Sequence, residues 1–250
     1  MSVNGVSLEY RRIVGNPALP ALVLLHQGLG CNALWRDFPD RLALATGRSV
    51  LLYSRAGYGG SDAIPLPRPL EYMSLEATDV LPQVLENAGI TEHTLVGHSD
   101  GASIALVYAG EIRDPNLKSL VLLAPHVFAE QSGVDSVGAA RETYTNGDLR
   151  DRLKKYHGDN VDCAFLGWSD SWMDPRFLRW SIESALGGVA VPVLQIQGRD
   201  DEYGTVEQLR RIEKGVKSSV QTLLFEECGH APHLERSEDT LRAIVQFCTS

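Results

Sequence analysis

The sequence has few of the features that mark membrane, metal-binding or disulfide-rich proteins. Its 250 residues include only four cysteines (Cys31, Cys163, Cys228 and Cys248), and their spacing matches neither a zinc motif nor a C-x-x-C pair. No run approaches the roughly 18 uninterrupted apolar residues of a membrane span, and the first residues lack the apolar core of a signal peptide. We therefore expect a cytoplasmic protein with reduced thiols, no metal and no membrane contact.

Positive charge is also scarce. Lys and Arg total 23 against 32 Asp and Glu, which gives a formal net charge of −9. Such an excess repels phosphate backbones and anionic lipid surfaces, so nucleic acid is not an expected partner. With 44% hydrophobic and 22% charged residues, the composition is that of a globular domain. It points to no organic cofactor and leaves the oligomeric state open.

Short apolar runs alternate with helical patterns along most of the chain. Runs typical of buried strands cover 21–25, 50–54, 94–96, 117–124, 191–196 and 220–225, after a hairpin or edge strand within 3–14. Helical patterns cover 33–45, 74–88, 102–109 and 237–247, and Pro82 should kink or shorten the second of these. This alternation predicts an α/β fold with a doubly wound, mostly parallel sheet.

The alternation stops after residue 125 and resumes near residue 189. The segment 126–188 has no strand pattern, and helical patterns cover 149–156 and 175–185. We expect this segment to form a helical lid on a core built from 1–125 and 189–250.

The segment Gly97-His98-Ser99-Asp100-Gly101 carries the pattern G-x-S-x-G at a predicted strand-to-helix turn. In a nucleophile elbow, small residues on both sides allow a sharp turn that exposes the serine at the top of the sheet. The pattern alone is weak, because it arises by chance in roughly one chain of this length in ten. A serine also needs a base, and that base needs a carboxylate to orient it.

Both partners occur in loops after the last two predicted strands. The first loop carries Asp200 and Asp201, and the second carries His230 and His233. The order serine, acid, histidine is typical of this architecture. We predict Ser99 as nucleophile, His230 as base and Asp201 as the orienting acid, with Asp200 as the alternative.

The negative oxygen formed during ester cleavage needs backbone N–H donors. One is expected from Asp100, which follows the nucleophile at the N-terminus of the next helix. The second is expected from the loop His26-Gln27-Gly28-Leu29-Gly30, whose glycines allow a substrate to approach closely. Gly28 is the preferred donor and Gln27 the alternative.

Together these motifs resemble those of the α/β-hydrolase superfamily, over essentially the whole chain. The matching segments are 26–30 (HQGLG), 55–61 (RAGYGGS), 97–101 (GHSDG), 198–201 (GRDD) and 229–233 (GHAPH). The resemblance implies an eight-stranded sheet with the lid inserted after its sixth strand, and serine hydrolase chemistry without a cofactor. Gln27 departs from the family pattern, because the usual His-Gly has glycine at this position.

An acid at position 100 is similar to valacyclovir hydrolase-like members, in which this residue helps to select substrates that carry an amino group. The alternative is that Asp100 only complements the helix dipole. Among the aromatic residues of the predicted lid, Phe165, Trp168 and Trp172 could line an apolar acyl site or could equally form lid core.

Three functions follow from this pattern, all with a small molecule as partner. The leading interpretation is a serine hydrolase that cleaves a small carboxylic ester through an acyl-enzyme. The resemblance also permits hydrolysis of carbon–carbon bonds in ring-cleavage products by the same triad, because a fold and a triad do not fix the substrate. The third is a ligand-binding protein without catalysis.

Overall fold

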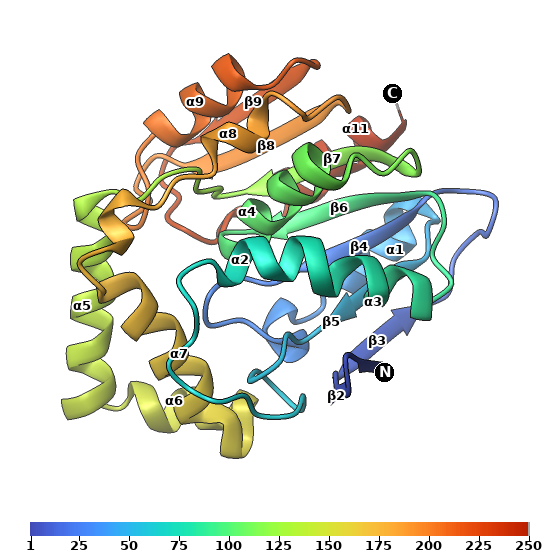
Figure 1. Ribbon diagram of the computed structural model, residues 1–250. Helices are drawn as coiled ribbons and strands as arrows, with labels where there is room; N and C mark the ends of the chain where they lie inside the picture. The colour runs from blue at the N-terminus through green and yellow to red at the C-terminus, as the bar shows by residue number, and fades with distance from the viewer. Residues whose placement is uncertain (250) are drawn as a thin grey trace.

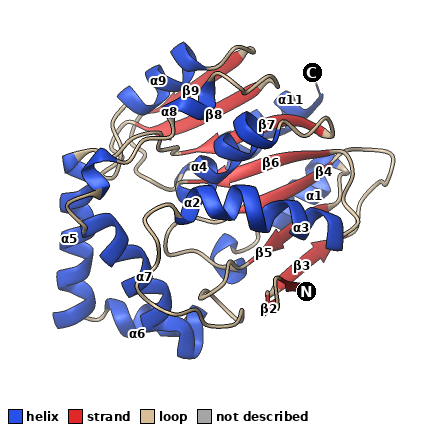
Figure 2. Ribbon diagram, in the orientation of Figure 1, coloured by secondary structure: helices blue, strands red, loops and turns tan. Residues whose placement is uncertain are grey.

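The computed structural model describes residues 1–249. A seven-stranded sheet in the order β3-β5-β4-β6-β7-β8-β9 lies at its centre, with helices on both faces (Figures 1 and 2). Neighbouring strands are parallel except β3, which runs antiparallel to β5. The strands are β3 (Tyr10–Ile13), β4 (Ala21–Leu25), β5 (Val50–Tyr53), β6 (His93–His98), β7 (Leu117–Leu123), β8 (Val193–Gly198) and β9 (Val220–Phe225). The predicted α/β class and the mostly parallel sheet are confirmed.

The sheet has one strand fewer than the eight expected. At the N-terminus, β1 (Ser2–Val3) and β2 (Val6–Ser7) pair only with each other. Asn4 and Gly5 turn the chain between them with positive φ angles of 51° and 80°. The expectation of eight strands is wrong because this short hairpin forms a separate sheet.

Alternating side chains of β4 show how the sheet is buried on both faces. Leu22 and Leu24 belong to one apolar cluster with side chains of α1 (Phe38–Thr46) and α11 (Ser237–Thr249). Val23 belongs to the other cluster, together with side chains of α3 (Leu81–Asn87) and α4 (Asp100–Val107). A strand covered on both sides must be apolar throughout, as the sequence of β4 is.

The helices of the core largely follow the predicted patterns. The pattern at 33–45 divides into a 3₁₀ turn and α1, and the pattern at 74–88 divides into α2 (Tyr72–Leu75), a π-helical turn (Glu76–Val80) and α3. Pro82 lies in the first turn of α3, directly after the π-helical turn that interrupts this helical run. The remaining core helices are α9 (Glu207–Gly215) and α10 (Pro232–Glu235). Within the described part of the chain, no helix combines the length and apolarity needed to cross a bilayer.

Between β7 and β8 the chain forms α5 (Gln131–Asn146), α6 (Leu149–His157), α7 (Val161–Met173) and α8 (Glu183–Leu186). In Figure 1, α5, α6 and α7 stand apart from the layers that cover the sheet, and we call these three helices the helical insertion. Backbone hydrogen bonds join the segments that precede and follow it, from Ile182 N to Val127 O at 2.8 Å and from Ala129 N to Trp180 O at 3.1 Å. Whether it acts as a lid with the predicted boundaries stays a prediction.

Two of these helices, α5 and α7, were not predicted from the sequence. The predicted helix at 149–156 corresponds to α6. The predicted helix at 175–185 is largely wrong, because this part contains only a 3₁₀ turn (Phe177–Arg179) and the start of α8.

Gly101 lies where α4 passes over β4. A Cβ atom at this position would overlap the backbone carbonyl of Leu25, which cannot move without separating helix from sheet. We predict that Gly101→Ala lowers the free energy of unfolding by about 2 kcal/mol or more, measured by urea denaturation.

Gly138, inside α5, provides a matched control because nothing lies within 4 Å of a Cβ built there. Gly138→Ala should raise the free energy of unfolding by about 0.5–1 kcal/mol, since alanine is the better helix former. Equal effects of the two substitutions would contradict the steric explanation.

Candidate active site

Ser99 lies on a strained turn between β6 and α4. Its backbone angles are φ 55° and ψ −118°, a conformation that costs a residue with a side chain of order 1–3 kcal/mol. The two flanking glycines make the turn sterically possible, because a Cβ atom on Gly97 would overlap the carbonyl of Gly101. The turn therefore holds Ser99 at the carboxyl end of β6.

The structure brings Asp201 and His230 together. His230 Nδ1 lies 2.8 Å from Asp201 Oδ1 and 2.9 Å from Oδ2, so the ring donates its Nδ1 proton to the carboxylate. The Asp201 side chain is 1% exposed, whereas Asp200 is exposed on the same loop. This contact leaves Nε2 of His230 as the nitrogen that can accept a proton.

Burial by itself would raise the pKa of the Asp201 carboxyl. Hydrogen bonds from the His230 ring and from Tyr203 N, at 2.9 Å, outweigh that effect and hold the pKa below its ordinary value. Asp201 is therefore an anion at neutral pH, as a group that orients a histidine must be.

Two further side chains fix the loop around His230. His98, next to Ser99, donates from Nε2 to the carbonyl of His230 at 2.7 Å. The carboxylate of Glu235 accepts from Gly229 N at 2.7 Å and from Ala231 N at 3.0 Å, one residue on each side of His230. Glu235 was not predicted from the sequence. An acidic residue near the start of a helix can accept hydrogen bonds from the unpaired backbone N–H groups there, and this pattern could have identified it.

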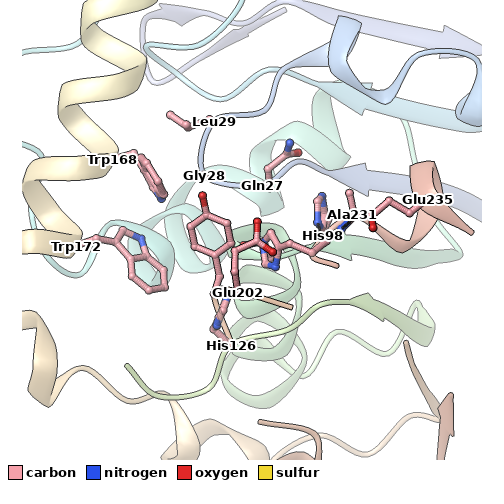
Figure 3. Close-up of a pocket in the computed structure, with 13 residues that line it drawn as sticks. Gln27, Gly28, Leu29, His98, His126, Trp168, Trp172, Glu202, Ala231 and Glu235 are labelled. Carbon is pink, nitrogen blue, oxygen red and sulfur yellow. Dashed lines mark hydrogen bonds between the residues drawn. The ribbon is translucent and has the colours of Figure 1, made fainter. Parts of the chain in front are cut away.

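Ser99 and His230 face one cavity of about 250 Å³ at the carboxyl end of the sheet (Figure 3). Trp168 and Trp172, one helical turn apart on α7, project toward it from the helical insertion. The other lining residues are Gln27, Gly28, Leu29, His98, His126, Glu202, Tyr203, Ala231 and Glu235.

Two of the three predicted backbone donors border this cavity, and the third follows Ser99 directly. Gln27 and Gly28 line it, and Gly28 lies so close to Trp168 that an added Cβ would overlap the indole ring. Asp100 is the first residue of α4, where N–H groups have no acceptor within the helix. All three backbone groups thus remain candidates for the oxyanion hole.

Two predicted substrate contacts are absent from the cavity wall. The Asp100 side chain is fully buried and turns into the protein, where the hydroxyl of Tyr72 donates to its Oδ2 at 2.5 Å. Phe165 is likewise fully buried and stacks on Tyr144 with ring centroids 3.7 Å apart, in the core of the helical insertion. In this structure neither side chain reaches the cavity, because each is taken up by partners that are distant in the sequence.

Two aromatic residues of the cavity were missed. The His126 ring centroid lies 5.6 Å from that of His230, and burial lowers the His126 pKa to about 3, so this ring is neutral. The ring centroid of Tyr203 lies 4.7 Å from that of His230. Their place in the sequence could have identified them, because each residue lies in the loop that follows a predicted strand.

The described residues offer no site for a metal. Within residues 1–249, no group of three or more His, Cys, Asp or Glu side chains is arranged to bind such an ion.

Comparison with known proteins gives the family. The model of a family described as "Alpha/beta hydrolase family" matches residues 22–243. This chain belongs to the alpha/beta hydrolase family. A proline iminopeptidase from Lactobacillus crispatus (strain ST1) is 32% identical over 95% of this chain and 93% of that protein.

Solved structures of other alpha/beta hydrolases have the same fold. An esterase from Exiguobacterium antarcticum covers 99% of this chain and 97% of its own, with a TM-score of 0.78 and 21% identity. The enol-lactonase from Burkholderia xenovorans LB400 covers 99% and 98%, with a TM-score of 0.75 and 20% identity. The family match supports a hydrolytic enzyme, and these structural likenesses support its fold.

We predict that this alpha/beta hydrolase loses stability below about pH 6.5, because buried neutral histidines must be protonated on unfolding. His233 packs against Trp35 and Phe38, and burial lowers its pKa to about 3. A histidine with a lowered folded pKa binds more protons when unfolded, so the free energy of unfolding falls as the pH decreases from about 6.5 toward 3. Each such histidine contributes about 1.4 kcal/mol per pH unit.

His233→Phe keeps an aromatic ring and removes this titration. Urea denaturation should show the same pH dependence in both proteins from pH 7.5 to about 6.5. From about pH 6.5 down to pH 5 the slope of the variant should become smaller than that of the unsubstituted enzyme, by a difference that approaches about 1.4 kcal/mol per pH unit. An unchanged slope would show that His233 is not buried in its neutral form.

Proposed function

We propose that this hydrolase cleaves small carboxylic esters through an acyl-enzyme on Ser99. The observation that carries the proposal is the His230–Asp201 pair, whose Nδ1–Oδ1 distance of 2.8 Å orients the imidazole in the cavity that Ser99 also faces. In this arrangement Ser99 is the nucleophile, His230 the general base and Asp201 the orienting anion.

The reaction proceeds in two halves. His230 Nε2 takes the proton of the Ser99 hydroxyl as Oγ attacks the ester carbonyl, and the resulting oxyanion is bound by the N–H groups of Asp100 and of Gly28 or Gln27. The intermediate collapses, the C–O bond to the alcohol breaks, and His230 returns the proton to the departing alkoxide. Water, deprotonated by His230, then attacks the acyl-enzyme and releases the carboxylic acid and Ser99.

The cavity supports a small, partly apolar substrate. Its volume of about 250 Å³ lies just below the roughly 300–1,000 Å³ that is common for small-molecule sites. Trp168 and Trp172 supply apolar surface against which an acyl or alcohol group can pack. His230 lines the same cavity from a loop of the core, with Asp201 buried behind it.

We predict that Ser99→Ala reduces kcat for a p-nitrophenyl ester of a short acid by about 10⁴-fold or more. Asp201→Asn should lower kcat by a similar factor, because an amide favours the wrong tautomer of His230. Initial rates of p-nitrophenol release measure both effects.

The exposed neighbour provides the control, and Asp200→Asn should leave kcat unchanged. Equal turnover by the unsubstituted enzyme and Ser99→Ala would overturn the assignment of the nucleophile. A loss with Asp200→Asn in place of Asp201→Asn would overturn the assignment of the acid.

A second candidate is hydrolysis of an amide next to a free amino group. The Lactobacillus crispatus relative is named a proline iminopeptidase. Glu202 and Glu235 stand on the cavity wall, and both carboxylates lie close to Gly229, beside His230. An acidic rim of this kind favours substrates with a cationic group.

Proline p-nitroanilide, an α-amino p-nitrophenyl ester and its N-acetyl form separate the two candidates. Esterase function predicts little preference for the free amine and weak turnover of the anilide. If the free amine raises kcat/KM by about tenfold or more and Glu202→Gln abolishes that preference, the second candidate replaces the first. A vinylogous diketone in the same assay tests carbon–carbon bond hydrolysis.

A further inference from the structure

Asp100 is tied to Arg55 inside the protein. Arg55 Nη2 lies 3.8 Å from Asp100 Oδ2, and the two side chains are 3% and 0% exposed. The hydroxyl of Tyr72 donates to the same carboxylate oxygen at 2.5 Å. Burying two charges costs desolvation free energy unless each charge has partners. The pair therefore constrains the relative position of the two segments that carry Arg55 and Asp100.

Arg55 also holds the loop that follows β4. Its Nη1 donates to the carbonyl of His26 at 2.5 Å and its Nη2 to the carbonyl of Gln27 at 3.0 Å. Its backbone N–H donates to Nε2 of the His26 ring at 3.0 Å. One guanidinium thus fixes the two peptide groups that precede Gly28.

The two sides of this contact are the two sides of the oxyanion hole. Asp100 begins α4 and carries one of the proposed N–H donors, and the loop held by Arg55 carries the other. We propose that Arg55 and Asp100 are positioning residues that set the distance between the two halves of the oxyanion hole. This inference rests on the proposed function of Ser99.

Two alternatives explain less of what is observed. A substrate-reading role is inconsistent with the burial of Asp100 and its absence from the cavity wall. A role in helix-dipole compensation needs an acid in the first turn, but it does not need Arg55 on the opposite loop. Arg55 Nε and Asp100 Oδ1 are moreover buried without a hydrogen bond in the described residues. Buried polar atoms without a hydrogen bond lower the stability of the fold. They are expected where the geometry of a functional site is kept at that cost.

The network continues to the cavity wall. Trp172 donates from its indole Nε1 to the Tyr72 hydroxyl at 3.1 Å, and Tyr72 in turn donates to Asp100. Because Trp172 lies on α7, this chain of donors also connects the helical insertion to the turn that carries Ser99.

The test compares Arg55→Lys, Asp100→Asn and Tyr72→Phe with the unsubstituted enzyme. Lysine keeps the charge but cannot contact two carbonyls and a carboxylate in one plane. Arg55→Lys and Asp100→Asn should lower kcat by about 10- to 100-fold, because misplaced oxyanion donors weaken only the transition state. KM should change by less than about threefold. Tyr72→Phe, which removes one hydroxyl, should lower kcat by about tenfold.

A trifluoromethyl ketone with the acyl group of the ester substrate reads out the oxyanion hole itself. Its adduct with Ser99 carries the negative oxygen, so its inhibition constant should rise by the same factor by which kcat falls. Binding of the product carboxylic acid should be weakened far less. Tyr108→Phe is the matched control. It removes the 2.7 Å hydrogen bond that the Tyr108 hydroxyl donates to Asp114, and neither residue lines the cavity. This substitution should change none of these values.

Several outcomes would overturn the inference. The first is an unchanged kcat in folded Arg55→Lys and Asp100→Asn enzymes. The second is an equal loss of affinity for the ketone and for the product acid, which would indicate a general structural role. If either variant fails to fold, Tyr72→Phe decides, since an unchanged kcat and ketone affinity in that variant contradict the inference. An inactive Ser99→Ala beside a fully active Asp100→Asn would leave the proposed function intact and remove this inference alone.

Discussion

The close approach between the turn after β6 and the end of β4 is the constraint on which the rest of the site depends. Neither Gly97 nor Gly101 has room for a Cβ atom, because each faces a backbone carbonyl directly. With both glycines in place, α4 starts on top of the sheet and Ser99 is held at a φ of 55°. Parallel partners on both sides of β6 supply the rigidity that sustains this strain.

Polar contacts between loops bring the rest of the site to this turn. His98 binds the backbone of His230, and Glu235 binds the N–H groups on both sides of it. Arg55 binds the backbone of the loop that precedes Gly28. These contacts run from side chains to backbone, and a site built in this way is organised before substrate arrives, as electrostatic catalysis requires.

The sequence predicted well wherever the signal was local. β4 and β9 have the predicted bounds, because short apolar runs between turn residues are typical of buried strands. Asp201 and His230 were candidates because polar residues and glycine follow such runs at the same edge of the sheet.

What the sequence did not predict depends on contacts between distant segments. The direction of the Asp100 side chain is set by Arg55 and Tyr72, which come from other elements. Helix α5 buries only Gly133, Val137 and Tyr144, so its apolar pattern is faint. The N-terminal hairpin has a sequence typical of strands, which does not say which strands it pairs with. In the structure β1 and β2 pair only with each other.

The central claim, that Ser99 is the nucleophile of a serine hydrolase, is tested most directly by covalent labelling. The enzyme is incubated with a fluorophosphonate, its intact mass is measured, and the modified peptide is identified by tandem mass spectrometry. The structure predicts one phosphonyl group per chain, located on Ser99, with loss of activity in proportion to labelling. A fully inactivated enzyme that carries the label on another residue, or an active enzyme that takes up no label, would contradict the claim.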